Sequence, residues 1–427
     1  MSGQRERMLR FVRRLGSAVA SQALLSAAAF AIGLLLIRRA SDAAYGAYVL
    51  AGSAILLVAS LQNALVGPAL AVRSAKLEPA PRAALVGGLY VTQRRLFLLA
   101  GALGAAAVAG LWALGHVPDA SALLIGVTAL ALAAILHREY FRIVLFVQGR
   151  PQAVLRGDLL YAAIALAGVA AVAEGAAAAA PAVAALGVAA AASAWRLAAA
   201  TRREQAWAAR RVPGLLRDIA PLAAWSAAGA AIHWSFSQGY VVLVAATLDV
   251  SAVAMLAATR LLLMPVNLLS TGIGALMLPQ AARWLARHGD ALLWRRLVVL
   301  ALASAALALA YCALLWWGRD WVFEELLRKR FAQRDTALAL WSAIFVVMVL
   351  RDQLAFSLAA QGRFREMTLL TLGCALLSLA ASYAAMRSFG VSGALAGMLA
   401  GETASLIGIV ALTRRAGVPP LSATARV

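Results

Sequence analysis

The sequence predicts an all-α polytopic membrane protein, and three observations lead to that class. Hydrophobic residues make up 63% of the 427 residues and charged residues only 13%, and the mean hydropathy is +0.84. The apolar residues form runs long enough to cross a bilayer, which takes roughly 20 residues of helix. The basic residues gather in short clusters between these runs. A soluble protein of ordinary composition is therefore excluded.

The apolar runs give the expected helices in order. The arginine-rich start MSGQRERMLRFVRR leads into LGSAVASQALLSAAAFAIGLLLI, which is long enough to span. We expect a spanning helix there, because a signal peptide has a shorter apolar core. The further runs are centred near residues 58, 105, 130, 166, 187, 234, 266, 305, 347, 377 and 402. Together they predict about twelve transmembrane helices.

The basic residues predict the orientation. Most of the Lys and Arg fall in every second connection, and the pair Arg94 and Arg95 is assigned to the same side. Basic connections stay in the cytoplasm, so both termini are expected there. The net charge is +21, but the basic residues lie between apolar runs rather than along one face, which argues against a nucleic-acid partner.

The chain is predicted to form two six-helix lobes. The longest basic connection, residues 201–218, separates an N-lobe (1–200) from a C-lobe (219–427) and is expected to be a cytoplasmic linker. Arg-Glu followed by Gln-Gly-Arg in the fourth span recurs with identical spacing as Arg-Asp and Gln-Gly-Arg in the tenth. We interpret this as duplication, giving parallel repeats about an axis along the membrane normal. Chance similarity in a chain so rich in Ala and Leu is the alternative.

Several kinds of catalytic site are excluded. No Gly-Lys-Ser/Thr phosphate loop is present, and the histidines are too scattered for a zinc motif. Cys312 and Cys374 lie inside apolar runs and are interpreted as small core residues. The sequence therefore predicts a protein that is not an enzyme and has no metal and no cofactor.

Charged residues inside the fourth and tenth spans are the first candidates for function. They are Arg138, Glu139 and Arg142, and then Arg351 and Asp352. Ionisable groups in the bilayer are costly, so they are kept where they face a cavity, a partner or a substrate. Ion pairs that pack helices are one interpretation. The other is that the arginines project into a cavity and grip phosphate oxygens.

The eighth and twelfth spans add three more candidates. Arg260 and Asn267 flank Pro265, and a proline kink is tolerated in lipid only where it faces protein or water. That span is a candidate moving or substrate-lining element. Glu402 is the single acidic residue of the last span and is either a group that titrates during transport or a buried structural carboxyl.

Polar residues also occur in the second and seventh spans. They are Gln62 and Asn63, and then His233, Trp234 and Gln238. Polar groups beside aromatic faces hold sugars, but polar side chains also join helices by hydrogen bonds. Both interpretations stay open.

The last span carries Gly393, Gly397 and Gly401, two overlapping GxxxG steps. Such steps allow another helix to approach closely. Packing within the monomer explains them better than dimerisation, so a monomer is expected.

Three segments resemble a known family. SQALLSAAAFAIGLLLIRRASDAAYGAYVLA, HREYFRIVLFVQGR and ATRLLLMPVNLL are similar to the Wzx-type oligosaccharide flippases of the MOP superfamily, and the likeness extends over nearly the whole chain. The resemblance implies a MATE-like arrangement of two lobes around a central cavity that opens alternately to each side. It implies a cargo of undecaprenyl-diphosphate-linked oligosaccharide, for exopolysaccharide, O-antigen or capsule synthesis. Arg138, Arg142, Arg260 and Arg351 are the residues here that would make such a cavity cationic.

The resemblance also implies a location and partners. The location is the bacterial inner membrane, and the partners are membrane lipids, a polysaccharide polymerase and a chain-length regulator. A proton or sodium gradient is the expected source of coupling. Three alternatives remain: a multidrug or cation antiporter of the same superfamily, a membrane enzyme such as a polymerase or glycosyltransferase, and a scaffold. The absence of acidic residues from the cores of the first two spans argues against the antiporter, and the lack of a large external loop argues against the enzyme.

Overall fold

The computed structural model describes residues 2–74, 77–204 and 209–415. Apart from one isolated bridge between Ala40 and Gly175, these residues form helices and their connections. The predicted all-α class is confirmed. The chain divides into two compact units, residues 1–234 (unit 1) and 235–427 (unit 2).

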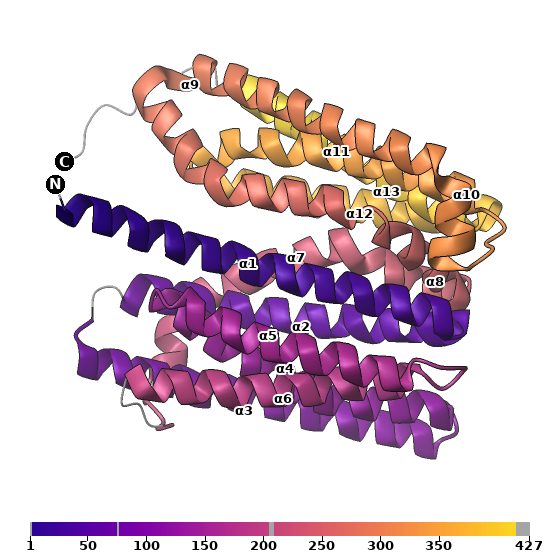
Figure 1. Ribbon diagram of the computed structural model, residues 1–427, viewed down its shortest axis with the longest axis horizontal. Coiled ribbons are helices and arrows are strands. Elements are labelled where there is room, and N and C mark those ends of the chain that lie inside the picture. The colour runs from indigo at the N-terminus through magenta and orange to yellow at the C-terminus, as the bar shows by residue number, and fades with distance from the viewer. Residues whose placement is uncertain (1, 75–76, 205–208, 416–427) are drawn as a thin grey trace. The chain divides into compact units, whose positions relative to one another are not determined.

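Unit 1 is built from the first helices of the chain, which run alongside one another (Figure 1). They are α1 (Ser2–Arg39), α2 (Asp42–Ser74), α3 (Pro79–Ala113), α4 (Asp119–Val147), α5 (Pro151–Val172), α6 (Ala179–Glu204) and the first part of α7 (Leu215–Thr247). Helix α4 packs against α2 and α6, α5 packs against α6, and α1 packs against α5. Tyr140, Phe141 and Leu145 of α4 lie at the centre of the core.

Unit 2 repeats this order of packing. It contains the rest of α7, α8 (Val250–Leu261), α9 (Met264–Trp317), α10 (Arg319–Trp321), the π-helical turn η1 (Val322–Leu327), α11 (Arg334–Ala360), α12 (Phe364–Phe389) and α13 (Val391–Arg415). Helix α11 packs against α9 and α13, and α12 packs against α13. The pairs α4 with α6 and α5 with α6 in unit 1 thus correspond to α11 with α13 and α12 with α13.

The predicted spans are recovered as helices. Among the described residues, ten helices are long and apolar enough to cross a membrane, or eleven with the pair formed by α8 and the start of α9, which is bent by 58°. The bend lies beside Pro265, where the sequence predicted a kink. Helix α7 is the remaining predicted span, and its polar middle, from His233 to Gln238, lowers its hydropathy.

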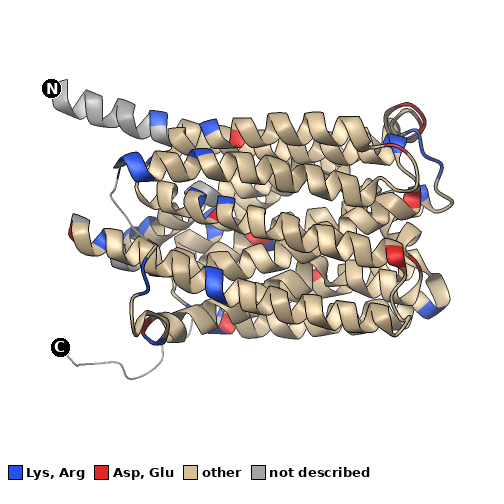
Figure 2. Cartoon of the chain, turned by 90° about the horizontal axis from the view of Figure 1, so that it is seen from below, with Lys and Arg blue, Asp and Glu red and all other residues tan. Residues whose placement is uncertain are grey.

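The surface of the helices also fits a membrane. Leu99 and Leu103 of α3 and Leu302 of α9 are more than half exposed. Charged residues lie mainly near the helix ends, with few in the middle (Figure 2). Because helices satisfy their backbone hydrogen bonds internally, such surfaces are stable in lipid. The protein is a multi-pass membrane protein.

The repeated Gln-Gly-Arg triplets are helix ends. Helix α4 ends at Val147 and α11 at Ala360, and the glycine two residues after each end, Gly149 or Gly362, has a positive φ angle of 71° or 73°. In both, the arginine amide donates to a carbonyl five residues earlier: Arg150 to Leu145 at 2.9 Å and Arg363 to Leu358 at 3.0 Å. This is the Schellman motif, which favours glycine because a Cβ strains the left-handed conformation.

Two assignments from the sequence differ from the structure. Arg94 and Arg95 lie inside the continuous helix α3 and not in a connection, because arginine is a good helix former and does not stop a helix. The units divide inside α7, after the predicted linker 201–218, since Leu215 and Ile219 pack in the core of unit 1. Residues 205–208 of that linker lie outside the described residues.

Candidate functional site

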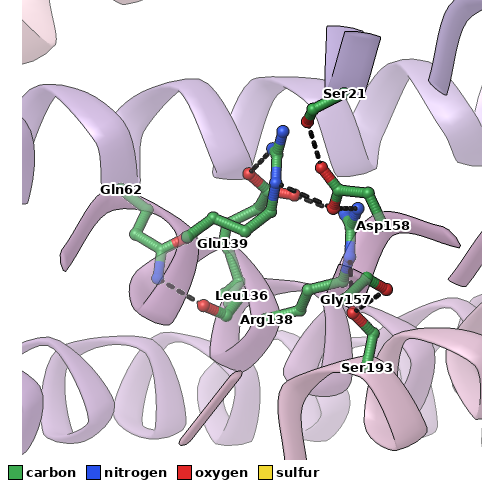
Figure 3. Close-up of polar contacts among 9 residues, drawn as sticks. Ser21, Gln62, Leu136, Arg138, Glu139, Gly157, Asp158 and Ser193 are labelled. Atoms are coloured by element: carbon green, nitrogen blue, oxygen red, sulfur yellow. Dashed lines mark hydrogen bonds and ion pairs between the residues drawn. The ribbon is translucent and has the colours of Figure 1, made fainter. Parts of the chain in front are cut away.

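The charged residues of α4 form a buried ion-pair cluster in unit 1 (Figure 3). Arg138 is 4% exposed, and its Nη2 lies 2.6 Å from Oδ1 of Asp158 on α5. Its Nη1 lies 2.6 Å from Oε1 of Glu139. Arg142, one turn further on, places Nη1 2.7 Å from Oε2 of Glu139 and Nε 3.1 Å from Asp158 Oδ1. We call Arg138, Glu139, Arg142 and Asp158 the α4 cluster.

Hydroxyl groups complete the α4 cluster and connect it to two more helices. Ser21 of α1 donates a hydrogen bond to Asp158 Oδ2. Arg138 Nε donates to Ser193 Oγ of α6 at 3.3 Å, and Ser193 in turn donates to the carbonyl of Gly157 at 2.8 Å. Arg138 also stacks on Tyr161, 4.0 Å from the ring centroid. The cluster therefore joins α1, α4, α5 and α6.

The α4 cluster has no excess charge, because two guanidinium groups meet two carboxylates. A buried guanidinium needs such compensation, since removing an ion from water costs several kcal/mol. The geometry fits the ion-pair interpretation of Arg138 and Arg142, because both carboxylates lie within unit 1 and already occupy the guanidinium groups.

Unit 2 contains a second ion-pair group around Arg351 of α11. Its Nη1 lies 2.6 Å from Oε2 of Glu402 on α13, and its Nη2 lies 2.7 Å from Oδ1 of Asp352. Ser270 of α9 donates to Asp352 Oδ2 at 3.0 Å. The guanidinium carbon lies 5.4 Å from the ring centroid of Phe236 on α7. One arginine here faces two carboxylates.

Arg260, in the last turn of α8, has different surroundings. Its Nη1 donates to Tyr240 Oη at 3.2 Å, and its guanidinium carbon lies 5.6 Å from the Trp341 ring centroid. The side chain is half-buried, and no carboxylate of the described residues forms an ion pair with it. Arg260 is therefore held by aromatic groups, and it interacts with Glu402 electrostatically without forming a direct ion pair.

The other predicted polar residues occupy varied places. Gln62 is fully buried and donates from Nε2 to Gln93 Oε1 at 2.9 Å and to the Leu136 carbonyl at 2.6 Å. Trp234 Nε1 donates to the Ser53 carbonyl at 2.9 Å. Both are interhelical bonds within unit 1. Asn63, His233 and Asn267 are exposed, and Gln238 is half-buried.

Sequence reasoning missed Asp158, the acidic centre of the α4 cluster. It lies two turns into α5, two residues after Arg156, and was not among the candidate residues. A charge balance would have found it, because two arginines in one span need carboxylates on a neighbouring helix. No group of three His, Cys, Asp or Glu that could hold a metal occurs among the described residues.

Comparisons with known proteins identify the fold. No protein-family model and no curated protein matches the sequence. Among solved structures, an inward-facing multidrug resistance MATE family transporter of the MOP superfamily matches with a TM-score of 0.74 and 13% identity, covering 93% of this chain and 98% of that chain. An outward-facing structure of such a transporter gives 0.66, 14% identity and 95% of each chain. A MATE structure in complex with MaL6 gives 0.63, 13% identity and 95% of each chain. The chain therefore has the fold of these MATE transporters.

Proposed function

We propose that this protein is a transporter that turns a lipid-linked oligosaccharide, held by its diphosphate, from one leaflet to the other by alternating access. The MATE fold supports the transporter part, since the similar structures include inward-facing and outward-facing conformations. We place the protein in the bacterial inner membrane with both termini in the cytoplasm. The carrier is undecaprenyl diphosphate, as the sequence resemblance implies.

The surroundings of Arg260 are the observation that supports an anionic cargo. Arg260 lies in a bent membrane segment, beside Tyr240 and Trp341, with no ion-pair partner among the described residues. An arginine in that position attracts a diphosphate by charge and by bidentate hydrogen bonds, and it repels a cation. Arg138, Arg142 and Arg351 are better explained as supports, because their guanidinium groups already bind carboxylates.

The remaining candidates receive roles that fit this transport. His233 and Asn267 are exposed polar groups suited to sugar hydroxyls, together with Asn63 and Gln238. Glu402 is the candidate for coupling to a proton or sodium gradient, because it lies 7% exposed in the last span. The translocated oligosaccharide is then a substrate for a polysaccharide polymerase and a chain-length regulator, which we propose as partners.

A multidrug or cation antiporter is the second candidate function. One observation favours it: Asp352 and Glu402 share the single guanidinium of Arg351, so carboxylates outnumber guanidinium groups among the direct ion pairs, and Arg260 acts on Glu402 only from a longer range. A carboxylate in excess attracts cations. The names of the similar MATE structures agree with this candidate.

Transport by reconstituted protein tests the anionic cargo. Proteoliposomes containing wild type or Arg260→Gln are assayed for translocation of a diphosphate-linked oligosaccharide lipid. We expect the Gln variant to lose about 2 to 3 kcal/mol of binding to the diphosphate, a loss of roughly 30- to 150-fold in rate at low substrate, because a charged hydrogen bond is removed. Arg260→Lys is expected to keep part of the rate.

Arg387→Gln is the matched control. Arg387 of α12 also donates to a tyrosine hydroxyl, Tyr383 at 2.8 Å, and stacks on its ring, but it is exposed at a helix end. Its substitution should leave transport unchanged. Full activity of Arg260→Gln would rule out the anion-binding role. Movement of a cationic dye instead of the lipid would favour the antiporter.

The orientation is tested by cysteine labelling in intact cells, with Cys312 and Cys374 replaced by Ala. A cysteine at Arg203, in the last turn of α6, is expected to react with an impermeant reagent only after permeabilisation. A cysteine at Glu174, in the connection before α6, should react in intact cells, because it lies at the other end of that helix. The reverse pattern would contradict cytoplasmic termini.

A further inference from the structure

Unit 1 contains a pocket that the transport proposal does not use. It has a volume of about 350 Å³ and lies among α3, α4 and α6. Its lining includes Tyr90, Arg94, His137, Phe141 and Arg202. Two of these residues are basic, three are aromatic, and none of the described lining residues is acidic.

The aromatic wall of the pocket is held in place by contacts among its own members. Tyr90 Oη lies 3.1 Å from His137 Nδ1, and their ring centroids are 5.4 Å apart. Phe141 packs on both, at 5.9 Å from Tyr90 and 5.1 Å from His137. Since these rings fix one another, the pocket is formed before any ligand binds, which lowers the cost of binding.

The basic residues approach the pocket from two different helices. Arg94 lies within α3, and Arg202 lies in the last turn of α6, and both side chains are exposed. Arg94 already interacts with the Tyr90 hydroxyl, and Arg202 also has interactions with its surroundings. A guanidinium has five N–H donors, so the two groups that line the pocket have further donors for one group of oxygens. Guanidinium groups bind phosphate bidentately, so the chemistry selects a phosphate.

The surroundings of Arg94 indicate where that phosphate comes from. Residues 80–113 of α3 are apolar enough to cross a membrane. Leu98, Leu99 and Leu103, which follow Arg94 on this helix, are 57%, 61% and 65% exposed. A cation followed by an exposed leucine surface matches a phospholipid, whose phosphate meets the cation while its acyl chains lie along the leucines. The geometry points to a binding site for an anionic phospholipid in the pocket of Tyr90, Arg94, His137 and Arg202.

Native mass spectrometry of the full chain in detergent tests this site. The probes are phosphatidylglycerol, phosphatidylcholine and sodium phosphate. We expect wild type to retain phosphatidylglycerol in preference to phosphatidylcholine. The pair Arg94→Gln and Arg202→Gln should weaken the first phosphatidylglycerol bound by at least about tenfold, because both charged contacts are lost. Arg94→Lys with Arg202→Lys should keep most of the affinity.

The neighbouring arginines supply the matched control. Arg95 and Arg203 follow Arg94 and Arg202 directly and are exposed, but they do not line the pocket. Their replacement by Gln removes the same net charge and should change the affinity by less than about twofold. Equal weakening by the two pairs would overturn the site, because it would show attraction by net charge alone.

Two further outcomes decide the proposal. Displacement of phosphatidylglycerol by an equal concentration of sodium phosphate would assign the pocket to a soluble anion and overturn the lipid. Helix content and melting temperature check that each variant is folded. If the double Gln variant does not fold, the single variants Arg94→Gln and Arg95→Gln are compared, and equal affinity would again overturn the site. Because lipid retention is measured without transport, this result is independent of the proposed cargo.

Discussion

Replacing Asp158 with Asn is expected to destabilise the protein by about 3 to 5 kcal/mol, because it leaves two buried guanidinium groups with a single carboxylate, that of Glu139. Arg138 is 4% exposed, and Asp158 is fully buried and bonded to Arg138, Arg142 and Ser21. An arginine cannot lose its proton in a protein, so the excess charge stays. Unfolding in detergent, followed by circular dichroism, measures the change.

A charge-balanced double variant separates this effect from the loss of packing. Adding Arg142→Gln to Asp158→Asn removes one charge of each sign, so most of the lost stability should return. Glu174→Gln is the exposed control, since Glu174 is 80% exposed and lies 3.9 Å from Arg39. A double variant less stable than Asp158→Asn would contradict charge balance as the reason for the cluster.

Gly397→Leu should destabilise unit 2 by about 3 kcal/mol or more, because two helix backbones would have to separate. A Cβ added at Gly397 would overlap the backbone of Ser382 on α12, and one at Gly393 would overlap that of Ala385. The predicted GxxxG steps therefore pack α13 against α12 within the same unit. The yield of folded protein and its melting temperature measure the loss.

Gly373→Leu is the matched control for this substitution. Gly373 lies on α12, and nothing lies within 4 Å of a Cβ built there. The same leucine should therefore be tolerated at Gly373. Similar losses at Gly373 and Gly397 would contradict the close contact as the cause and indicate a general cost of leucine in these helices.

The helices could be predicted from the sequence because lipid leaves the backbone few alternatives. A long apolar run in a membrane has to satisfy its own hydrogen bonds, so the apolar runs became α-helices. The helix ends at Gly149 and Gly362 were also visible, as the repeated Gln-Gly-Arg triplets. Arg94 and Arg95 lie inside α3 rather than in a connection, because a pair of arginines does not break a helix, and the side of the membrane predicted for them stays a prediction.

The candidate site was predicted less completely. Arg138, Arg142 and Arg351 were found because charges stand out in apolar helices, but their partners depend on which helices are neighbours. Asp158 meets Arg138 only because α5 packs beside α4 and α6, and Glu402 meets Arg351 only because α13 packs beside α11. A single sequence contains the charges but not these neighbours. Arg260 differs from the other arginines only in what surrounds it.

The shared helix α7 has a consequence for fragments of this chain. The internal repeat suggests that a gene cut near residue 210 would yield two independent halves. However, Leu215 and Ile219 contribute to the core of unit 1, together with Tyr140 and Leu145. A fragment ending at residue 210 would leave that core open, and its C-terminal counterpart would begin with an apolar helix face that lacks its neighbours. The duplicated stretch of sequence and the stretch that packs as one unit are thus different lengths of chain, because the boundary between the units lies within the continuous helix α7.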